Sequence, residues 1–145
     1  MFGIFFEDEN SPFDNGYGKH LLARIRLGEY SEELHIPVGY WSSDEYKRNW
    51  KKSLATGLEK RDHSLLITSM HDPVNLNFFS SWVIYYDKEN SFVQNKIIFL
   101  EDFPKFDLSM IENYIGIHEI INEDGFRISE WMVKTEDVIS FYNEL

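Results

Sequence analysis

Residues 21–38, LLARIRLGEYSEELHIPV, have the pattern of a β-hairpin. Apolar side chains occupy every second position from 21 to 27, which is the period of a strand with one buried face. Gly28 then begins a two-residue connection, and glycine is favoured at the first position of a type II′ hairpin turn. This turn sets a register in which Arg24 lies opposite Glu33, a favourable cross-strand charge pair. We therefore expect two antiparallel strands joined at Gly28.

The next segment has the periodicity of an amphipathic helix at about 43–60. Ser42 is followed three residues later by Glu45, which is the spacing of a capping box. Large apolar side chains recur every fourth residue along one side: Tyr46, Trp50, Leu54 and Leu58. Basic residues fall mostly on the other side, so we interpret the stripe as core and the basic side as a solvated surface. A nucleic-acid-binding helix is disfavoured, because the aromatic residues belong to the stripe that must be buried.

Further strands are predicted after this helix. A short apolar strand is expected at 65–70, and a second hairpin is expected to pair 78–86 with 92–100. In the strand at 78–86 both faces are apolar. Such a strand is either covered on both sides or has one side reserved for a partner.

A third hairpin is predicted from 114–121 and 126–133. Gly125 suits the left-handed position of a three-residue loop with a bulge. That loop places His118 opposite Glu130, whereas a tighter turn would bring two glutamates together.

The chain is expected to end in a helix at about 135–144, with Thr135 as its cap. Residues 7–19 and 101–110 are rich in turn-forming or polar residues and are predicted to be loops. No repeat or linker is visible, so residues 1–145 are predicted to form one domain. Adjacent hairpins without βαβ alternation indicate an α+β fold, with an antiparallel sheet and helices on one side.

The charge is strongly acidic, with a net value of −11. Residues 42–61 hold six basic residues against three acids, a local charge of +3 that leaves −14 for the remainder. Such a surface repels nucleic acid and anionic membranes and attracts cationic partners over about 10 Å. Simple solubility is the alternative explanation of the acidity. The chain has no cysteine, no basic leader and no apolar run of membrane-spanning length, so we predict a soluble intracellular protein.

Candidate catalytic residues are few. In LLITSMHDPVNLNF, residues 65–78, His71 and Asp72 form the sharpest pair. Adjacent residues of an extended chain point to opposite sides, and Asp followed by Pro73 favours a β-turn. The histidines lack a recognised metal spacing, and no nucleophile or phosphate-binding motif is present. We predict no catalytic, metal or cofactor site, and a small hydrolase that uses His71, Asp72 or Glu130 is the alternative.

A set of local patterns resembles a known family. ARIRLGEYSEELHI, YWSSDEYKRNW, LLITSMHDP, NFFSSW, QNKIIFL and NEDGFRISEW occur in this order. Together they resemble the CdiI-like immunity proteins of bacterial contact-dependent growth inhibition systems. The resemblance covers the chain from about residue 20 to its end and does not include residues 1–19. Its motifs are structural and not catalytic.

The resemblance implies a cytoplasmic protein that binds and neutralises the C-terminal toxin domain delivered by a neighbouring bacterium. Toxins of these systems are often nucleases, and a basic nuclease would be attracted by the acidic surface. Acids on loops, flanked by aromatic anchors, are then the predicted contacts: Asp72, Glu101, Asp102, Glu123 and Asp124, with Tyr86 and Trp131. An acidic mimic of nucleic acid and an adaptor without a toxin partner remain alternatives.

Overall fold

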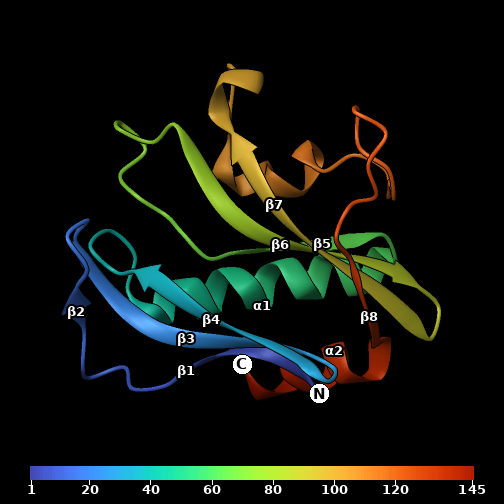
Figure 1. Ribbon diagram of the computed structural model, residues 1–145, viewed down its shortest axis with the longest axis horizontal. Coiled ribbons are helices and arrows are strands. Elements are labelled where there is room, and N and C mark those ends of the chain that lie inside the picture. Colours follow the sequence, from blue (N-terminus) through green and yellow to red (C-terminus); the bar gives the residue numbers. More distant parts are fainter.

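The helix predicted at about 43–60 is α1 (Ser43–Lys60), which runs between two four-stranded antiparallel sheets (Figure 1). The computed structural model describes residues 1–145. The first sheet contains β1 (Phe2–Phe6), β2 (Phe13–Asp14), β3 (Lys19–Leu27) and β4 (Tyr30–Pro37). The second contains β5 (His63–Ile67), β6 (Phe78–Asp87), β7 (Asn90–Phe99) and β8 (Trp131–Lys134). The other helices are η1 (Leu100–Asp102), η2 (Leu108–Tyr114) and α2 (Thr135–Glu144), of which η1 and η2 are 3₁₀-helices.

In the first sheet, β3 pairs with β4 along one edge and with β1 and β2 along the other. The predicted register of the β3–β4 hairpin is confirmed, because Arg24 lies opposite Glu33. Gly28 has a φ of 67°, a left-handed conformation that glycine adopts at little cost. The prediction of a loop at 7–19 is wrong for the short strand β2 and for Lys19, where β3 begins.

The stripe of α1 joins the two sheets. The predicted capping box of Ser42 and Glu45 is present at its N-terminus. Tyr46, Trp50 and Leu54 are completely buried. The Tyr46 hydroxyl donates to the carbonyl of Pro37 in β4 at 2.6 Å, and Trp50 Nε1–H donates to the carbonyl of Ile67 in β5 at 2.7 Å. The apolar stripe therefore also carries hydrogen bonds that fix α1 against both sheets.

The second sheet has the order β5-β6-β7-β8. Its β6–β7 hairpin confirms the predicted pairing of 78–86 with 92–100 and is longer, since the ladder continues to Asp87 opposite Asn90. The strand predicted at 65–70 is shifted toward the N-terminus as β5.

The predicted hairpin of 114–121 with 126–133 forms only at its tip, where the three-residue loop and its register are as predicted. Gly125 has a left-handed φ of 84°, and the Asn122 N–H donates to the Phe126 carbonyl at 2.8 Å. The two long strands are absent. The first half of the hairpin begins at the end of η2 and continues without strand structure, and only an isolated bridge joins Ile121 to Arg127.

Residues 131–134 of the second half form β8, which pairs with the free edge of β7 and places Val133 beside Ser91. This pairing buries Val133, which explains why β8 joins a strand that is remote in sequence.

Thr135 is not the cap of the last helix. The N-cap position is Lys134, whose side chain makes no capping bond, and the Thr135 hydroxyl is hydrogen-bonded to the Ser91 hydroxyl at 2.7 Å. The expected position of the helix is correct. The loop predicted at 101–110 is interrupted by η1 and η2. The α+β class built from antiparallel hairpins is confirmed, whereas the expectation of one sheet is wrong because there are two.

Replacing Tyr46 with phenylalanine is expected to lower the free energy of unfolding by about 2 kcal/mol, because buried partners lose their hydrogen bonds. The hydroxyl donates to Pro37 and accepts the backbone N–H of Met70 at 2.9 Å. Tyr85 is the matched control, since its hydroxyl is buried without a partner and its removal should cost nothing. Urea denaturation of Tyr46→Phe and Tyr85→Phe measures both changes. Equal destabilisation of the two variants would contradict the assignment.

Candidate partner-binding surface

His71 and Asp72 form a corner of the chain. Asp72 Oδ1 accepts the backbone N–H of Val74 at 3.0 Å, and the Asp72 carbonyl accepts that of Asn75 at 2.9 Å. The His71 and Asp72 side chains are both exposed. The predicted Asp-Pro turn is therefore confirmed, and the carboxylate serves the turn.

Glu130 holds an irregular segment, residues 115–130, against the second sheet. Its Oε1 atom contacts His118 Nε2 and accepts a hydrogen bond from Gln94 Nε2 at 3.0 Å. The His118 ring stacks on Tyr85 with a centroid separation of 4.6 Å. The predicted approach of His118 to Glu130 is confirmed, although no β-ladder produces it. These contacts give Glu130 a structural role.

The five acids predicted to bind a partner lie in three connections that follow β5 in the chain. Asp72 lies between β5 and β6, Glu101 and Asp102 lie in η1, and Glu123 and Asp124 lie between η2 and β8. All five are exposed. In Figure 1 these connections project from the second sheet on the side away from the first sheet. The fold thus places the three connections on one side of the molecule, spread along its length.

The two predicted aromatic anchors have different surroundings. Trp131 is half-buried and stacks on Tyr30 with a centroid separation of 4.9 Å. Tyr86 is also half-buried, but its hydroxyl donates to Ser64 Oγ at 2.8 Å. Burial raises the pKa of the Tyr86 hydroxyl above its ordinary value, which keeps it protonated as a donor. The two residues therefore differ in that the polar atom of Tyr86 is already bonded within the chain.

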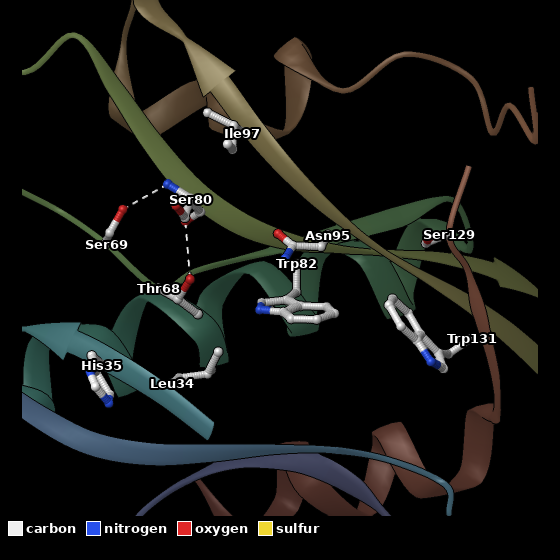
Figure 2. Close-up of a pocket in the computed structure, with 10 residues that line it drawn as sticks. All are labelled: Leu34, His35, Thr68, Ser69, Ser80, Trp82, Asn95, Ile97, Ser129 and Trp131. Carbon is white, nitrogen blue, oxygen red and sulfur yellow. Dashed lines mark hydrogen bonds between the residues drawn. The ribbon is translucent and has the colours of Figure 1, made fainter. Parts of the chain in front are cut away.

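A cleft of about 560 Å³ lies between the sheets, and Trp131 forms part of its wall (Figure 2). Leu34 of β4, Trp82 of β6 and Ile97 of β7 supply further apolar walls. Ser69 and Thr68 line the cleft beside Ser80 and are hydrogen-bonded to its backbone at 2.8 and 3.4 Å. No lysine, arginine, aspartate or glutamate belongs to the lining. Of the residues that line this cleft, only Trp131 was predicted from the sequence to bind a partner. The signal that could have found Trp82 was the presence of two apolar faces on the strand at 78–86.

None of the helices is both long enough and apolar enough to span a lipid bilayer. A family model described as the CdiI N-terminal domain matches residues 36–141. The chain is 38% identical over 145 residues to the immunity protein CdiI of Enterobacter cloacae subsp. cloacae, with 100% of this chain and 99% of that protein covered.

The same relationship is found in three dimensions. The structure matches a chain of the CdiA-CT/CdiI toxin and immunity complex from Enterobacter cloacae with a TM-score of 0.94 and 38% identity. The match covers 99% of this chain and 97% of that chain. The resemblance carried by the sequence motifs is confirmed. The chain therefore belongs to the CdiI family of immunity proteins, which are not enzymes.

Proposed function

We propose that this protein binds the C-terminal toxin domain of a CdiA-type protein in the cytoplasm and neutralises it. The observation that carries the proposal is the near-complete structural match to a chain from a toxin and immunity complex. A binding role also agrees with exposed acids on loops and a cleft that lacks charged residues. The experiment is co-expression with the cognate CdiA-type toxin domain. Restored growth supports the proposal, and continued growth arrest despite soluble expression of both proteins overturns it.

We further propose that the toxin is a basic nuclease. The net charge of −11 attracts a basic domain and accelerates its association. Nuclease domains are basic where they hold nucleic acid. The same attraction therefore brings the acids of the immunity protein to the nucleic-acid-binding surface of the toxin, which is the surface that an inhibitor has to cover. An acidic mimic of nucleic acid would present acids in rows, whereas the five acids proposed as contacts lie in three separate connections.

The exposed acids Asp72, Glu101, Asp102, Glu123 and Asp124 are the proposed electrostatic contacts. Trp131 is the stronger of the two proposed anchors, because it borders the cleft and stacks on an exposed tyrosine. Tyr86 is the second proposed anchor; its ring is half-buried and its hydroxyl bonds to Ser64.

Replacing the five acids by Asn and Gln is expected to lower the association rate constant for the toxin about tenfold at low salt, because steering depends on local charge. At high salt the rates of variant and wild type should converge. The measurement is stopped-flow fluorescence at both salt concentrations.

The control for this prediction carries the same change in net charge elsewhere. It neutralises exposed acids away from the three connections: Glu29, Glu59, Asp87, Glu89 and Glu144. We expect this control to slow association less than the first variant. Equal association rate constants for the two variants at low salt would show that only the total charge matters. The five acids would then not be a specific contact site.

A further inference from the structure

One end of the β6–β7 hairpin extends past the elements that cover the rest of its face. β6 and β7 contain 10 residues each, whereas β5 contains 5 and pairs with β6 only from Ser81 to Tyr85. The helix α1 packs against β5. Trp82 and Ile84 are therefore buried, but Phe78 at the start of β6 is 48% exposed.

The register places further apolar residues on this uncovered part. Phe78 lies opposite Phe99, and Ser80 lies opposite Ile97. Because side chains alternate along a strand, all four share the face that carries Trp82. Ile97 is 51% exposed and Phe99 is 47% exposed. We call Phe78, Ser80, Ile97 and Phe99 the overhanging strip.

The overhanging strip continues directly into the cleft of Figure 2. Ser80 and Ile97 belong to both, and the cleft leads on to Trp82 and Trp131. The strip and the cleft together form a surface of mixed character. Its apolar groups are Phe78, Phe99 and the Leu34, Trp82, Ile97 and Trp131 side chains of the cleft, and its polar groups are uncharged serine, threonine and asparagine side chains with His35. A surface of this kind suits an apolar side chain of a partner surrounded by polar contacts.

Charge at the margins of the strip is negative. The exposed Asp72 lies in the connection before β6, and the exposed Glu101 and Asp102 follow Phe99 within three residues. Lys96 is the only basic residue of the two strands and lies over the Tyr85 ring at 5.4 Å, on the opposite face. An apolar centre with acids at its margins fits a partner that has an apolar centre and cations around it.

We propose that the overhanging strip is where the basic toxin domain docks, with an apolar toxin side chain in the cleft and toxin cations against the marginal acids. This inference rests on the proposed function. The alternative docking surface within the chain is the connection formed by residues 115–130, in which Ile117 is 80% exposed and Phe126 is 71% exposed. That connection has only an isolated bridge as regular structure and is otherwise held by side chains such as Glu130, whereas the strip belongs to a continuous ladder. A rigid surface loses less conformational entropy on binding, so the strip is favoured.

The experiment compares two paired variants against the purified cognate CdiA-type toxin domain, by biolayer interferometry. Phe78→Ala with Phe99→Ala is expected to weaken binding at least about 100-fold, because both rings lie at the centre of the contact. The matched control, Ile117→Ala with Phe126→Ala, removes an exposed apolar pair elsewhere and should stay within about threefold of wild type. Circular dichroism melts establish that each variant is folded. Should the Phe78 and Phe99 pair fail to fold, Ile97→Lys replaces it and is expected to lose binding through charge repulsion.

The outcomes separate the two proposals. Loss of binding in the strip variant alone supports docking on the strip. Loss in the control alone, in both pairs or in neither overturns it while leaving the proposed function intact. Absence of toxin binding by the wild-type chain overturns the proposed function itself. A further outcome is that the wild-type protein sediments as a dimer, and that the strip variant is monomeric but binds the toxin with unchanged affinity. This result would assign the strip to contact with a second copy of the chain and would also overturn toxin docking.

Discussion

Trp50→Ala is expected to lower the free energy of unfolding by about 3–5 kcal/mol, the cost of deleting a large aromatic side chain from a core. Trp50 is completely buried, and its ring stacks on Phe6 of β1 with a centroid separation of 5.8 Å. Its Nε1–H also donates to Ile67 in β5, so truncation leaves a buried carbonyl without its partner. Small domains have total stabilities of about 5–15 kcal/mol, so this loss is a large share of the whole.

Urea denaturation followed by fluorescence and circular dichroism measures this effect. Trp50→Phe is the graded control, because it keeps most of the apolar volume and loses the hydrogen bond to Ile67. We expect its cost to lie well below that of Trp50→Ala, at about 1–3 kcal/mol. If Trp50→Ala unfolded within about 1 kcal/mol of wild type, the central role of this side chain would be refuted.

Gly57→Ala is the second large prediction, with an expected loss of about 3 kcal/mol, at the upper end of what overpacking costs. A β-carbon at this position would collide with Ser64 Oγ and with the backbone carbonyl of His63. The hydroxyl could rotate, but the carbonyl is part of β5, so α1 and the second sheet would have to move apart. Alanine ordinarily stabilises a helix by about 1 kcal/mol relative to glycine. A net loss of stability at Gly57 would therefore have to come from the collision with β5.

Gly116→Ala provides the comparison for this substitution. No atom lies within 4 Å of the position of its added β-carbon, and its backbone is not in the left-handed region. We expect a change within about 0.5 kcal/mol. Thermal and urea unfolding of both variants test the pair, and a neutral Gly57→Ala would mean that α1 and β5 can separate at little cost.

Local patterns in the sequence predict those elements whose partners are close in the chain. The hairpin around Gly28 and the cap formed by Ser42 and Glu45 were predictable because turn and capping geometry depend on neighbouring residues. The pairing of β8 with β7 was not, because periodicity identifies a strand without naming its partner. The same limit applies to the division into two sheets.

The candidate surface was predictable in a similar, partial way. Exposed acids in connections are visible in the sequence, and Asp72, Glu101 and Glu123 lie where turn-forming residues place them. The strand at 78–86 showed two apolar faces, but its sequence cannot indicate which part of a face α1 covers. Phe78 and Trp82 share one face, yet Phe78 is 48% exposed and Trp82 only 1% exposed. That difference arises from tertiary packing.

The short length of β5 relative to its neighbours has an evolutionary consequence. Because β6 and β7 extend beyond the end of β5, the side chains of Phe78, Ile97 and Phe99 are about half exposed. They therefore contribute less to the stability of the fold than fully buried side chains do. Mutations at these sites are therefore tolerated by the scaffold, while Trp50 and Gly57 are constrained by packing. On the proposed docking surface, a lineage can diversify what it recognises through a few codons without first acquiring compensating changes in its interior.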